Sequence, residues 1–371
     1  MQNSSAPYVR PSPEQSIYVT PMGYMHASFL GSAMLLDGAM ELVSSGTLFT
    51  ALEVAVWQNG TVKFSLVPAA SLQEWINSCG AKIKEVVEAR ADILCASRRS
   101  FAGLSLDRTK IMGVINVTPD SFSDGGKFLT PKKAIEHGLQ LLQAGADILD
   151  VGGESTRPGA KPVCSELEIQ LTEPVVRALA NQGALVSIDT RHADVMSAAL
   201  TAGACIVNDV TALTGDSKSL AIVKESNASV ILMHMQGDPQ TMQKNPEYRW
   251  VPGDVFDYLE TRVDICQAAG IELSRLCVDP GIGFGKSDGH NADVLSHLGM
   301  LHGLGCAVMV GASRKSFISR SSNNEGTDER LPGSVAIGLE AVRQGVQIIR
   351  THDVKETLQA FKVQQRVLTG R

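Results

Sequence analysis

The chain has 371 residues, of which 44% are apolar, and its formal net charge at pH 7 is -6. This length allows one barrel-sized domain plus a smaller one, and the apolar share is enough for a substantial core. The acidic balance, without any run of Lys or Arg, argues against a nucleic-acid-binding surface. A small anionic ligand would therefore need a local cluster of cations.

Seven cysteines are scattered along the chain without a CxxC pair or a zinc-type Cys/His spacing. We expect reduced thiols that mostly pack inside a cytoplasmic protein. The apolar patch at residues 27–36 is interrupted by Gly31 and Ser32, and it lacks the basic start and cleavage pattern of a signal peptide. No apolar stretch approaches the roughly 20 residues that a membrane helix needs, so we expect no contact with a membrane.

Residues 1–105 differ in character from the remainder, and we predict that they form a small α+β domain before a larger domain at residues 106–371. Gln58-Asn59-Gly60 lies between two apolar runs and predicts a hairpin, and residues 81–100 have the pattern of a charged amphipathic helix. Other short strands and helices are expected at residues 33–43, 47–57, 61–67 and 71–78. No pattern here has a recognised chemical meaning, and we interpret His26, Glu53 and Trp57 as structural.

From residue 110 onward, short β-branched runs alternate with longer amphipathic segments. Strands are predicted at residues 110–116, 147–151, 184–189, 204–209, 229–234, 276–279, 307–312 and 346–350. Helices are predicted at residues 131–144, 165–181, 191–202, 216–226, 254–269, 291–303, 333–344 and 353–368. Eight strand-then-helix units in about 260 residues favour an α/β fold of the (β/α)8 TIM-barrel type over a doubly wound open sheet.

Polar side chains follow nearly every predicted strand. In chain order they are Asn116, Gly152-Gly153-Glu154, Asp189, Asn208-Asp209, His234, Asp279, Ser313-Arg314-Lys315, and Arg350 with His352. One aspartate at a strand end is often a helix cap, but a whole ring of polar groups is difficult to explain by capping. Because the C-terminal face of a TIM barrel carries the active site, we predict that these residues meet there.

The stretch GVINVTPDSFSDGG at residues 113–126 passes from a buried strand into an oxygen-rich loop that has no basic residue of its own. In a closed barrel the last strand pairs with the first, so Arg350 and His352 would lie beside this loop. Together they would bind an anion such as phosphate. Two alternatives stay open: an ordinary turn in the loop, and a salt bridge from Arg350 and His352 to Asp353 without any ligand.

The same loop offers candidate metal ligands. Mg²⁺ prefers oxygen ligands and usually binds through one or two protein groups, several waters and substrate phosphate. Asn116, and either Asp120 or Asp124, would suit that role.

Asp189 and Asn208 end neighbouring predicted strands, and Asp279 and Lys315 end another neighbouring pair. Two carboxylates and an amide in a barrel mouth suit a flat heterocycle with an amino-pyrimidinone edge, because a carboxylate accepts two parallel N–H bonds from such a group. Lys315 would donate to a ring carbonyl or nitrogen. A tight catalytic pair of carboxylates is not expected, since these strands lie on different sides of the barrel.

Two more stretches are rich in glycine. DVGGESTRPGA at residues 150–160 places a second polar loop beside the first, where both would close over a substrate. DPGIGFGK at residues 279–286 lacks the GxxxxGK[ST] spacing, so a nucleotide site of the Walker type is not supported. Its glycines are expected to curl the backbone so that Phe284 and Lys286 face the rim, with Phe284 as a wall for a ring.

These motifs together resemble dihydropteroate synthase, the folate-pathway family that sulfonamides inhibit. The resemblance runs from about residue 108 to the C-terminus and rests on GVINVTPDSFSDGG, DVGGESTRPGA, SIDT, VNDV, LMHMQG, DPGIGFGK, GASRKSF and IIRTHD. It implies a TIM barrel that usually forms a homodimer. It also implies a reaction in which 4-aminobenzoate displaces pyrophosphate from 6-hydroxymethyl-7,8-dihydropterin diphosphate, with Mg²⁺ as cofactor.

The resemblance further implies roles for individual residues. The pterin pocket would comprise Asp189, Asn208, Asp279 and Lys315, and the diphosphate would meet Asn116, Arg350 and His352. The aminobenzoate side would be shaped by Phe122, Thr156, Arg157, Pro158, Phe284 and Ser313. Asn116 would bind Mg²⁺, and the other catalytic residues would be Asp120, Arg157, Lys315, Arg350 and His352. Whether Asp120 or Asp124 meets the metal or the substrate stays open.

Two other functions also stay open. A methyltransferase that presents methyltetrahydrofolate to a corrinoid protein would share Asp189, Asn208 and Asp279, but it would not need Arg350 and His352 beside the first loop. A pterin-binding module without catalysis is the second alternative. The N-terminal region is the main departure from the family pattern, and we hypothesise that it is a structural or dimer-contacting domain.

Overall fold

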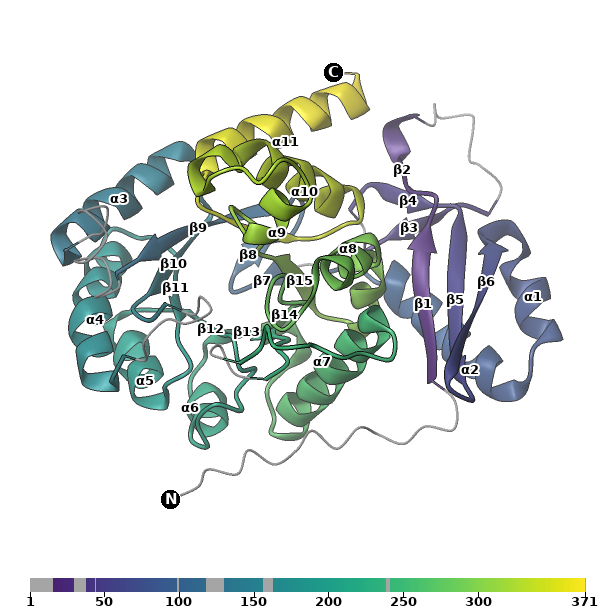
Figure 1. Cartoon of the computed structure of the whole chain (residues 1–371), viewed down its shortest axis with the longest axis horizontal. Coiled ribbons are helices and arrows are strands. Elements are labelled where there is room, and N and C mark those ends of the chain that lie inside the picture. The colour runs from purple at the N-terminus through teal and green to yellow at the C-terminus, as the bar shows by residue number, and fades with distance from the viewer. Residues whose placement is uncertain are drawn as a thin grey trace.

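The computed structural model of the chain describes residues 16–29, 38–43, 45–98, 100–117, 130–155, 163–237 and 241–370. Two parts lie side by side in Figure 1: helices arranged around a barrel, and a smaller part built from the N-terminal residues. The barrel carries the predicted site, and the smaller part packs against its outer wall.

Eight parallel strands form a closed barrel. They are β9 (Lys110–Asn116), β10 (Ile148–Gly152), β11 (Val186–Asp189), β12 (Ile206–Asp209), β13 (Ser229–Met233), β14 (Leu276–Asp279), β15 (Ala307–Val310) and β16 (Ile348–Thr351). The last strand closes the ring by pairing with the first, which sets Arg350 opposite Met112. The (β/α)8 TIM-barrel prediction is confirmed, and the open-sheet alternative is wrong because an open sheet lacks this pair.

Helices surround the barrel, and local chemistry sets where they begin and end. In α3, the Thr130 side chain accepts a hydrogen bond from the Lys133 backbone, Pro131 starts the helix, and Gly145 ends it with φ 101°. The helices are α3 (Pro131–Ala144), α4 (Ser165–Asn181), α5 (Ala193–Ala202), α6 (Ser219–Glu225), α7 (Val251–Ala268), α8 (Asp288–Ser296), α9 (Ser316–Arg320), α10 (Leu331–Arg343) and α11 (Val354–Thr369).

One predicted helix is divided in the structure. The pattern predicts a single helix over residues 291–303, whereas α8 ends at Ser296 and a 3-10 helix, η5 (Leu298–Leu304), follows it. The backbone leaves the helical conformation at His297 (φ -117°, ψ 22°). A Cβ atom at Gly299 would lie 2.0 Å from the Tyr24 hydroxyl, so the altered turn and the glycine together let the N-terminal part approach the barrel closely.

A short hairpin closes the N-terminal end of the barrel. It is formed by β7 (Ser100–Phe101) and β8 (Leu104–Ser105). Phe101, which is buried, packs in one cluster with residues at or near the starts of the strands, namely Met112, Ile148, Ile206, Ile231, Cys277, Ala307 and Ile348. The barrel is therefore filled at this end, and its opposite face remains for a site.

The N-terminal part contains an antiparallel sheet in the order β1 (Ser16–Met22), β5 (Ala51–Gln58), β6 (Thr61–Pro68). A smaller sheet has the order β2 (Met25–His26), β4 (Thr47–Phe49), β3 (Met40–Leu42). The predicted hairpin is confirmed, with Asn59 (φ 52°) and Gly60 (φ 78°) at the turn between β5 and β6. The helices α1 (Leu72–Ser78) and α2 (Ala81–Cys95) complete the predicted α+β fold.

The helix predicted over residues 81–100 ends early, at Cys95. The guanidinium of Arg98 explains this end, because it donates to the carbonyl oxygens of Ile93 at 3.0 Å and Ala96 at 2.7 Å. Last-turn carbonyls of a helix need such partners. Arg98 also donates to the His302 carbonyl oxygen at 2.7 Å, so one side chain caps α2 and ties it to the barrel.

The N-terminal part and the barrel share an apolar interface. Tyr18 of β1 is buried in the main core cluster, with its ring centroid 5.3 Å from that of Trp250 and 6.0 Å from that of Phe256. Its hydroxyl donates to Asp257 Oδ2 at 2.8 Å, and Arg90 forms an ion pair with Glu260. Tyr18, Asp257, Arg90 and Glu260 thus have polar partners across this interface, as buried polar groups require.

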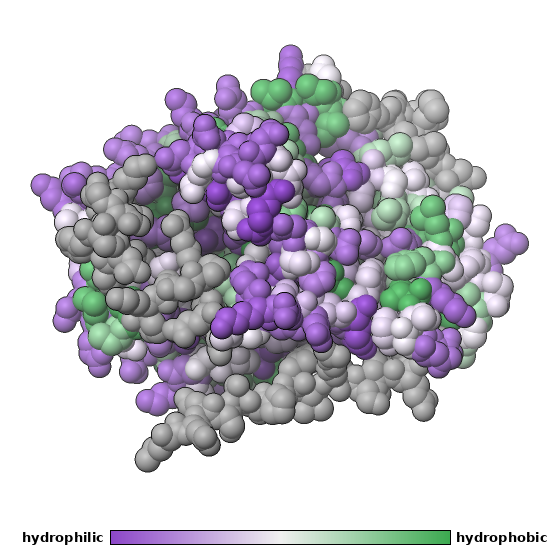
Figure 2. All heavy atoms as spheres, in the orientation of Figure 1, coloured by the Kyte–Doolittle hydropathy of each residue, from purple (hydrophilic) through white to green (hydrophobic). Residues whose placement is uncertain are grey.

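None of the helices in the described part of the chain is long and apolar enough to cross a membrane. All seven cysteines are unpaired, and Cys266, Cys277 and Cys306 are buried. Figure 2 shows apolar surface over the N-terminal part, where Phe64 and Leu66 of β6 are exposed.

Deletion of residues 1–98, which leaves the β7–β8 hairpin in place, is predicted to make the barrel self-associate. The reason is that Trp250 and Phe256 lose their apolar cover. Sedimentation velocity should show larger assemblies than the full chain forms. In the deleted chain, Trp250→Gln should reduce this association. Identical sedimentation of the full and deleted chains would contradict the interface described here.

Candidate active site

The carboxyl ends of the strands bring the predicted polar residues to one face of the barrel. Asn116, Asp189 and Asp279 are the last residues of β9, β11 and β14. The other predicted residues that the structure describes on this face are Asn208 in β12, Ser313 and Lys315 after β15, Arg350 in β16, His352 after it, and Phe284 after β14. Carboxylates, amides and cations from different strands therefore meet at the barrel mouth.

Arg350 connects two other strands of the barrel. Its Nε donates to Asp150 Oδ2 at 2.6 Å, and its Nη2 donates to Asp189 Oδ2 at 2.7 Å. Burial alone would lower the pKa of Arg350, but the two carboxylates outweigh burial and hold this pKa above its ordinary value. The guanidinium thus keeps its positive charge in the barrel mouth, where the side chain is 21% exposed.

Asp150 is a site residue that the sequence analysis did not identify. It lies in β10 and is fully buried. Its Oδ2 accepts a second hydrogen bond, from Asn208 Nδ2 at 3.0 Å. The available signal was a carboxylate inside a strand covered on both faces, because such a charge needs a cationic partner.

Asp279 and Lys315 stand at neighbouring strands β14 and β15. Asp279 Oδ1 accepts from the Gly281 backbone at 2.7 Å, and Lys315 donates to the Ile282 carbonyl oxygen. Burial raises the pKa of Asp279, an effect that Lys315 opposes. Burial also lowers the pKa of Lys315 to about 8, an effect that Asp279 opposes. Lys315 is therefore a hydrogen-bond donor at neutral pH.

The Phe284 ring lies next to the ammonium group of Lys315. The Lys315 Nζ atom is 4.6 Å from the centroid of the Phe284 ring, which is a cation–π distance. The ring is half-buried. The aromatic side chain therefore lies next to Lys315, and its role as a wall for a ring stays a prediction.

Lys286 does not face the rim, contrary to the prediction. It is 1% exposed, and its Nζ lies 2.8 Å from His234 Nδ1, 3.0 Å from the Gly281 carbonyl oxygen and 3.2 Å from that of Phe284. Burial lowers the pKa of both Lys286 and His234 well below their ordinary values. The long Lys286 side chain thus holds the loop after β14 in place through hydrogen bonds to two of its carbonyl oxygens.

The curl of this loop depends on glycine. Gly281 has φ 67°, and a Cβ atom there would lie 1.9 Å from the His234 carbonyl oxygen. The loop after β14 therefore packs directly on the segment after β13, and only glycine fits at this position.

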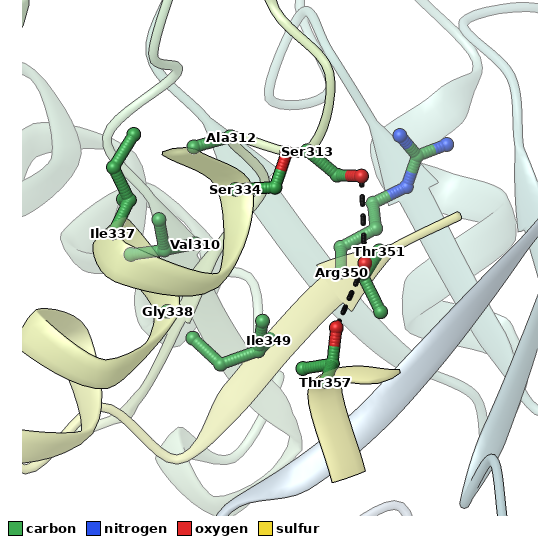
Figure 3. A pocket seen from close by; sticks show the side chains of 10 residues that line it. All are labelled: Val310, Ala312, Ser313, Ser334, Ile337, Gly338, Ile349, Arg350, Thr351 and Thr357. Carbon is green, nitrogen blue, oxygen red and sulfur yellow. Dashed lines mark hydrogen bonds between the residues drawn. The ribbon is translucent and has the colours of Figure 1, made fainter. Parts of the chain in front are cut away.

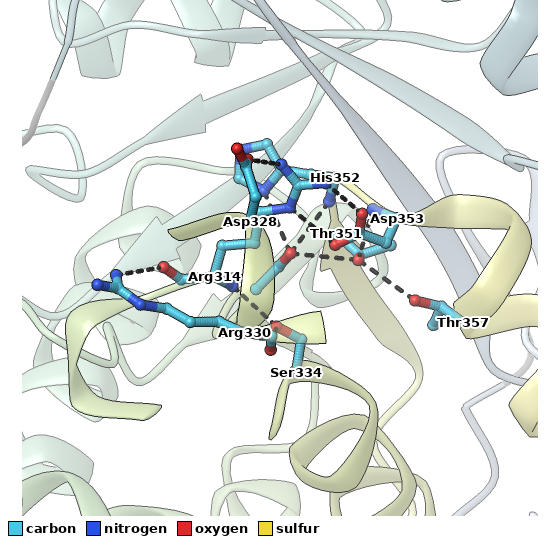
Figure 4. Close-up of polar contacts among 9 residues, drawn as sticks. Arg314, Asp328, Arg330, Ser334, Thr351, His352, Asp353 and Thr357 are labelled. Atoms are coloured by element: carbon cyan, nitrogen blue, oxygen red, sulfur yellow. Dashed lines mark hydrogen bonds and ion pairs between the residues drawn. The ribbon is translucent and has the colours of Figure 1, made fainter. Parts of the chain in front are cut away.

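Ser313 and His352 meet at the corner between β15 and β16. Ser313 Oγ accepts from the His352 backbone N–H at 3.2 Å and lies 3.2 Å from His352 Nδ1. Next to them, Arg314 Nε donates to Asp353 Oδ2 at 3.0 Å, as Figure 4 shows. The alternative in which Arg350 pairs with Asp353 is wrong: Asp353 binds Arg314, and Arg350 binds Asp150 and Asp189.

A small cavity lies behind this corner, between the strands β15–β16 and the helices α10–α11 (Figure 3). Thr351 Oγ1 lies 3.4 Å from Ser313 Oγ and 3.3 Å from Thr357 Oγ1 along its wall. The free space of about 10 Å³ corresponds to one water molecule. The cavity is therefore too small for a substrate.

The second polar loop is anchored at its two ends. Glu154 accepts from Arg191 Nε at 2.8 Å and from Arg191 Nη2 at 3.0 Å. It also accepts from the Val163 backbone at 3.2 Å. Although burial opposes the charge, Arg191 holds the pKa of Glu154 below its ordinary value. One carboxylate thus joins the residues on either side of segment 156–162.

Several predicted residues lie outside the described ones: Asp120, Phe122, Asp124, Thr156, Arg157 and Pro158. Their roles stay predictions. Within the described ranges, no group of three His, Cys, Asp or Glu side chains could hold a metal ion. Asn116 pairs with Gly152 of β10 at the end of its strand.

Comparisons with known proteins assign the chain to a family. The family model described as pterin binding enzyme matches residues 112–352. The dihydropteroate synthase of Neisseria meningitidis serogroup B is 46% identical over 265 residues, which cover 70% of this chain and 93% of that relative. The chain belongs to the dihydropteroate synthase family.

Solved structures of dihydropteroate synthase agree. The Xanthomonas albilineans enzyme with 4-aminobenzoic acid is 44% identical, covers 71% of this chain and 94% of its own, and has a TM-score of 0.66. The Yersinia pestis enzyme in a sulfonamide drug complex is 42% identical, covers 71% of this chain and 97% of its own, and has a TM-score of 0.68.

Family membership confirms the predicted activity: the chain is a transferase of folate biosynthesis that makes 7,8-dihydropteroate and pyrophosphate. The assignment favours the synthase over the corrinoid methyltransferase and over a module without catalysis. The family match starts at residue 112, so the N-terminal part of this synthase precedes the matched region.

Lys286→Met is predicted to lower the free energy of unfolding by about 2–3 kcal/mol, because buried acceptors of the loop after β14 lose their donor. Urea unfolding measures this change. The exposed Lys244, changed to Met, is the control and should shift the free energy by less than about 0.5 kcal/mol. A Lys286→Met variant as stable as the control would refute the fastening role.

Proposed function

We propose that the barrel mouth binds dihydropterin diphosphate with its diphosphate at Arg350. The observation that carries this proposal is the fixed guanidinium. Among the described residues, two of its five N–H donors are engaged, by Asp150 and Asp189. The remaining donors suit phosphate oxygens, which a guanidinium binds in a fork. Ser313 and His352 stand next to this position and would add further donors.

The pterin ring would lie against Asp189, Asn208 and Asp279. A carboxylate accepts parallel hydrogen bonds from an amino-pyrimidinone edge. Buried carboxylates recognise such donors strongly, because an unmatched ring would leave them without partners. Lys315 would donate to the ring oxygen or nitrogen.

The reaction would need charge stabilisation more than a strong base. The bond between the pterin methylene carbon and the diphosphate oxygen breaks, and its electron pair leaves with pyrophosphate. The neutral amine nitrogen of 4-aminobenzoate forms the new C–N bond and releases a proton. Arg350 would stabilise the negative charge that grows on the leaving group. The electron-rich dihydropterin would delocalise the positive charge on the methylene.

We assign Mg²⁺ to the diphosphate end of the site, with Asn116 as its protein ligand. The amide oxygen fits, because Mg²⁺ binds through one or two protein oxygens together with waters and substrate phosphate. Asn116 ends the strand that neighbours β16, which carries Arg350. When bound, the ion would supply charge stabilisation to the leaving pyrophosphate.

The aminobenzoate side would be built from Phe284 and Ser313 together with loop residues. Those residues are Asp120, Phe122, Thr156, Arg157 and Pro158. Because the related Yersinia pestis structure is a complex with a sulfonamide drug, we propose that sulfonamides compete with 4-aminobenzoate at this side of the site.

We further propose a cytoplasmic homodimer in which the N-terminal part is structural. Its sheet covers Trp250 and Phe256 on the outer wall of the barrel. A second copy would therefore contact a surface other than this one. The activity needs no residue of the N-terminal part, since all proposed site residues follow residue 110.

Arg350→Ala is predicted to weaken binding of dihydropterin diphosphate roughly 30-fold or more, because charge-assisted hydrogen bonds to the phosphates are lost. Binding of 6-hydroxymethyl-7,8-dihydropterin, which has no phosphate, should weaken less than about threefold. Calorimetric titration with each ligand measures both values. Arg320→Ala removes an exposed arginine that pairs with Asp288, and it should alter neither affinity. Equal losses for both ligands in Arg350→Ala would refute the assigned role.

A further inference from the structure

One carboxylate lies between the two halves of the proposed site. Asp150 of β10, Asn208 of β12 and Arg350 of β16 come from alternate strands of the barrel. In a TIM barrel, side chains from alternate strands share one interior layer. Asp150 Oδ2 contacts both of the others, at 2.6 Å to Arg350 Nε and 3.0 Å to Asn208 Nδ2.

We infer that Asp150 is a positioning residue, which orients Arg350 for the diphosphate and Asn208 for the pterin ring. This inference rests on the proposed roles of Arg350 and Asn208. Asp150 itself is fully buried and has no predicted contact with substrate.

The first argument concerns Arg350. Asp189 also accepts a hydrogen bond from this guanidinium. However, Asp189 belongs to the proposed pterin pocket and would accept hydrogen bonds from the pterin ring when substrate binds. Asp150 accepts its hydrogen bond from Nε, the guanidinium nitrogen that is bonded to the aliphatic part of the Arg350 side chain. The two terminal nitrogens are then directed away from Asp150. The guanidinium therefore stays fixed when Asp189 turns to the substrate.

The second argument concerns Asn208. A carboxylate is only an acceptor, so Asp150 requires the NH2 group of Asn208 on its own side. The Asn208 carbonyl oxygen then points to the other side. Asp150 thus decides which hydrogen bonds Asn208 offers to a pterin.

The third argument is the cost of burying this charge. Asp150 Oδ1 is buried and accepts no hydrogen bond from any described residue. A buried ion pair with an unsatisfied oxygen is a poor source of stability. Stability therefore does not explain why a carboxylate is buried here, whereas the orientation of Arg350 and Asn208 does.

A purely Coulombic role of Asp150 predicts a change in diphosphate affinity opposite in sign to the change that a positioning role predicts. Removal of a buried negative charge beside Arg350 should strengthen the attraction of the site for an anion. If Asp150 positions Arg350, removal should instead weaken diphosphate binding. The sign of the change therefore separates the two explanations.

The test uses Asp150→Leu, which has nearly the same shape and no acceptor, and Asp150→Asn, which keeps one acceptor without the charge. Calorimetric titration of the full chain with dihydropterin diphosphate should show at least tenfold weaker binding for Asp150→Leu. Asp150→Asn should bind less than about threefold more weakly, since its oxygen still accepts from Arg350. Unchanged or tighter binding in Asp150→Leu would overturn the inference.

A double-mutant cycle with Arg350→Ala shows whether Asp150 acts through Arg350. The effect of Asp150→Leu on diphosphate binding should become clearly smaller in the Arg350→Ala background, where only the part that acts through Asn208 remains. Equal effects in both backgrounds would overturn the inference. If Arg350→Ala alone does not discriminate the two ligands, the proposed role of Arg350 fails instead.

Asp147→Leu controls for a general loss of fold. Asp147 precedes the other end of β10 and accepts from the Ile111 backbone at 2.9 Å. The Asp147→Leu variant should have a lower free energy of unfolding, but its affinities for dihydropterin diphosphate and for the pterin without phosphate should not change. Asp150→Ser is the second variant if Asp150→Leu does not fold, and the same weakening is expected from it.

Discussion

The whole site depends on the ion pairs of Arg350 with Asp150 and Asp189. The arginine is on the last strand, β16, and its two partners are on β10 and β11, which follow β9 around the barrel. These contacts form only when the last strand pairs with the first. Closure of the barrel and assembly of the anion site are therefore one event, and the charged residues at the mouth are costly to bury unless that event is complete.

The rest of the site is held by contacts beneath the mouth. Lys286 fastens the loop after β14 from inside, and the Tyr248 hydroxyl donates to the Gly285 carbonyl oxygen of the same loop at 2.6 Å. Two residues further on, Trp250 packs against Tyr18 of the N-terminal part. The N-terminal part thus contacts the segment that supports the loop, although it contributes no proposed site residue.

Sequence periodicity was enough to predict the barrel and the ring of polar residues, because strand ends in a parallel barrel share one face. It could not identify Asp150 or place Lys286, since both depend on which way a buried side chain points and on a partner far along the chain. The divided helix near Gly299 and the early end of α2 were also missed. At the first, Gly299 lies against Tyr24 of the N-terminal part, and at the second, Arg98 donates to the carbonyl oxygens of Ile93, Ala96 and His302. The periodicity of the sequence does not show such contacts.

Product formation by the full chain is the most direct test of this account. The protein is incubated with dihydropterin diphosphate, 4-aminobenzoate and Mg²⁺, and pyrophosphate and 7,8-dihydropteroate are measured together. We expect equal amounts of the two products, and none when either substrate is left out. Binding of the pterin without formation of either product would contradict the account.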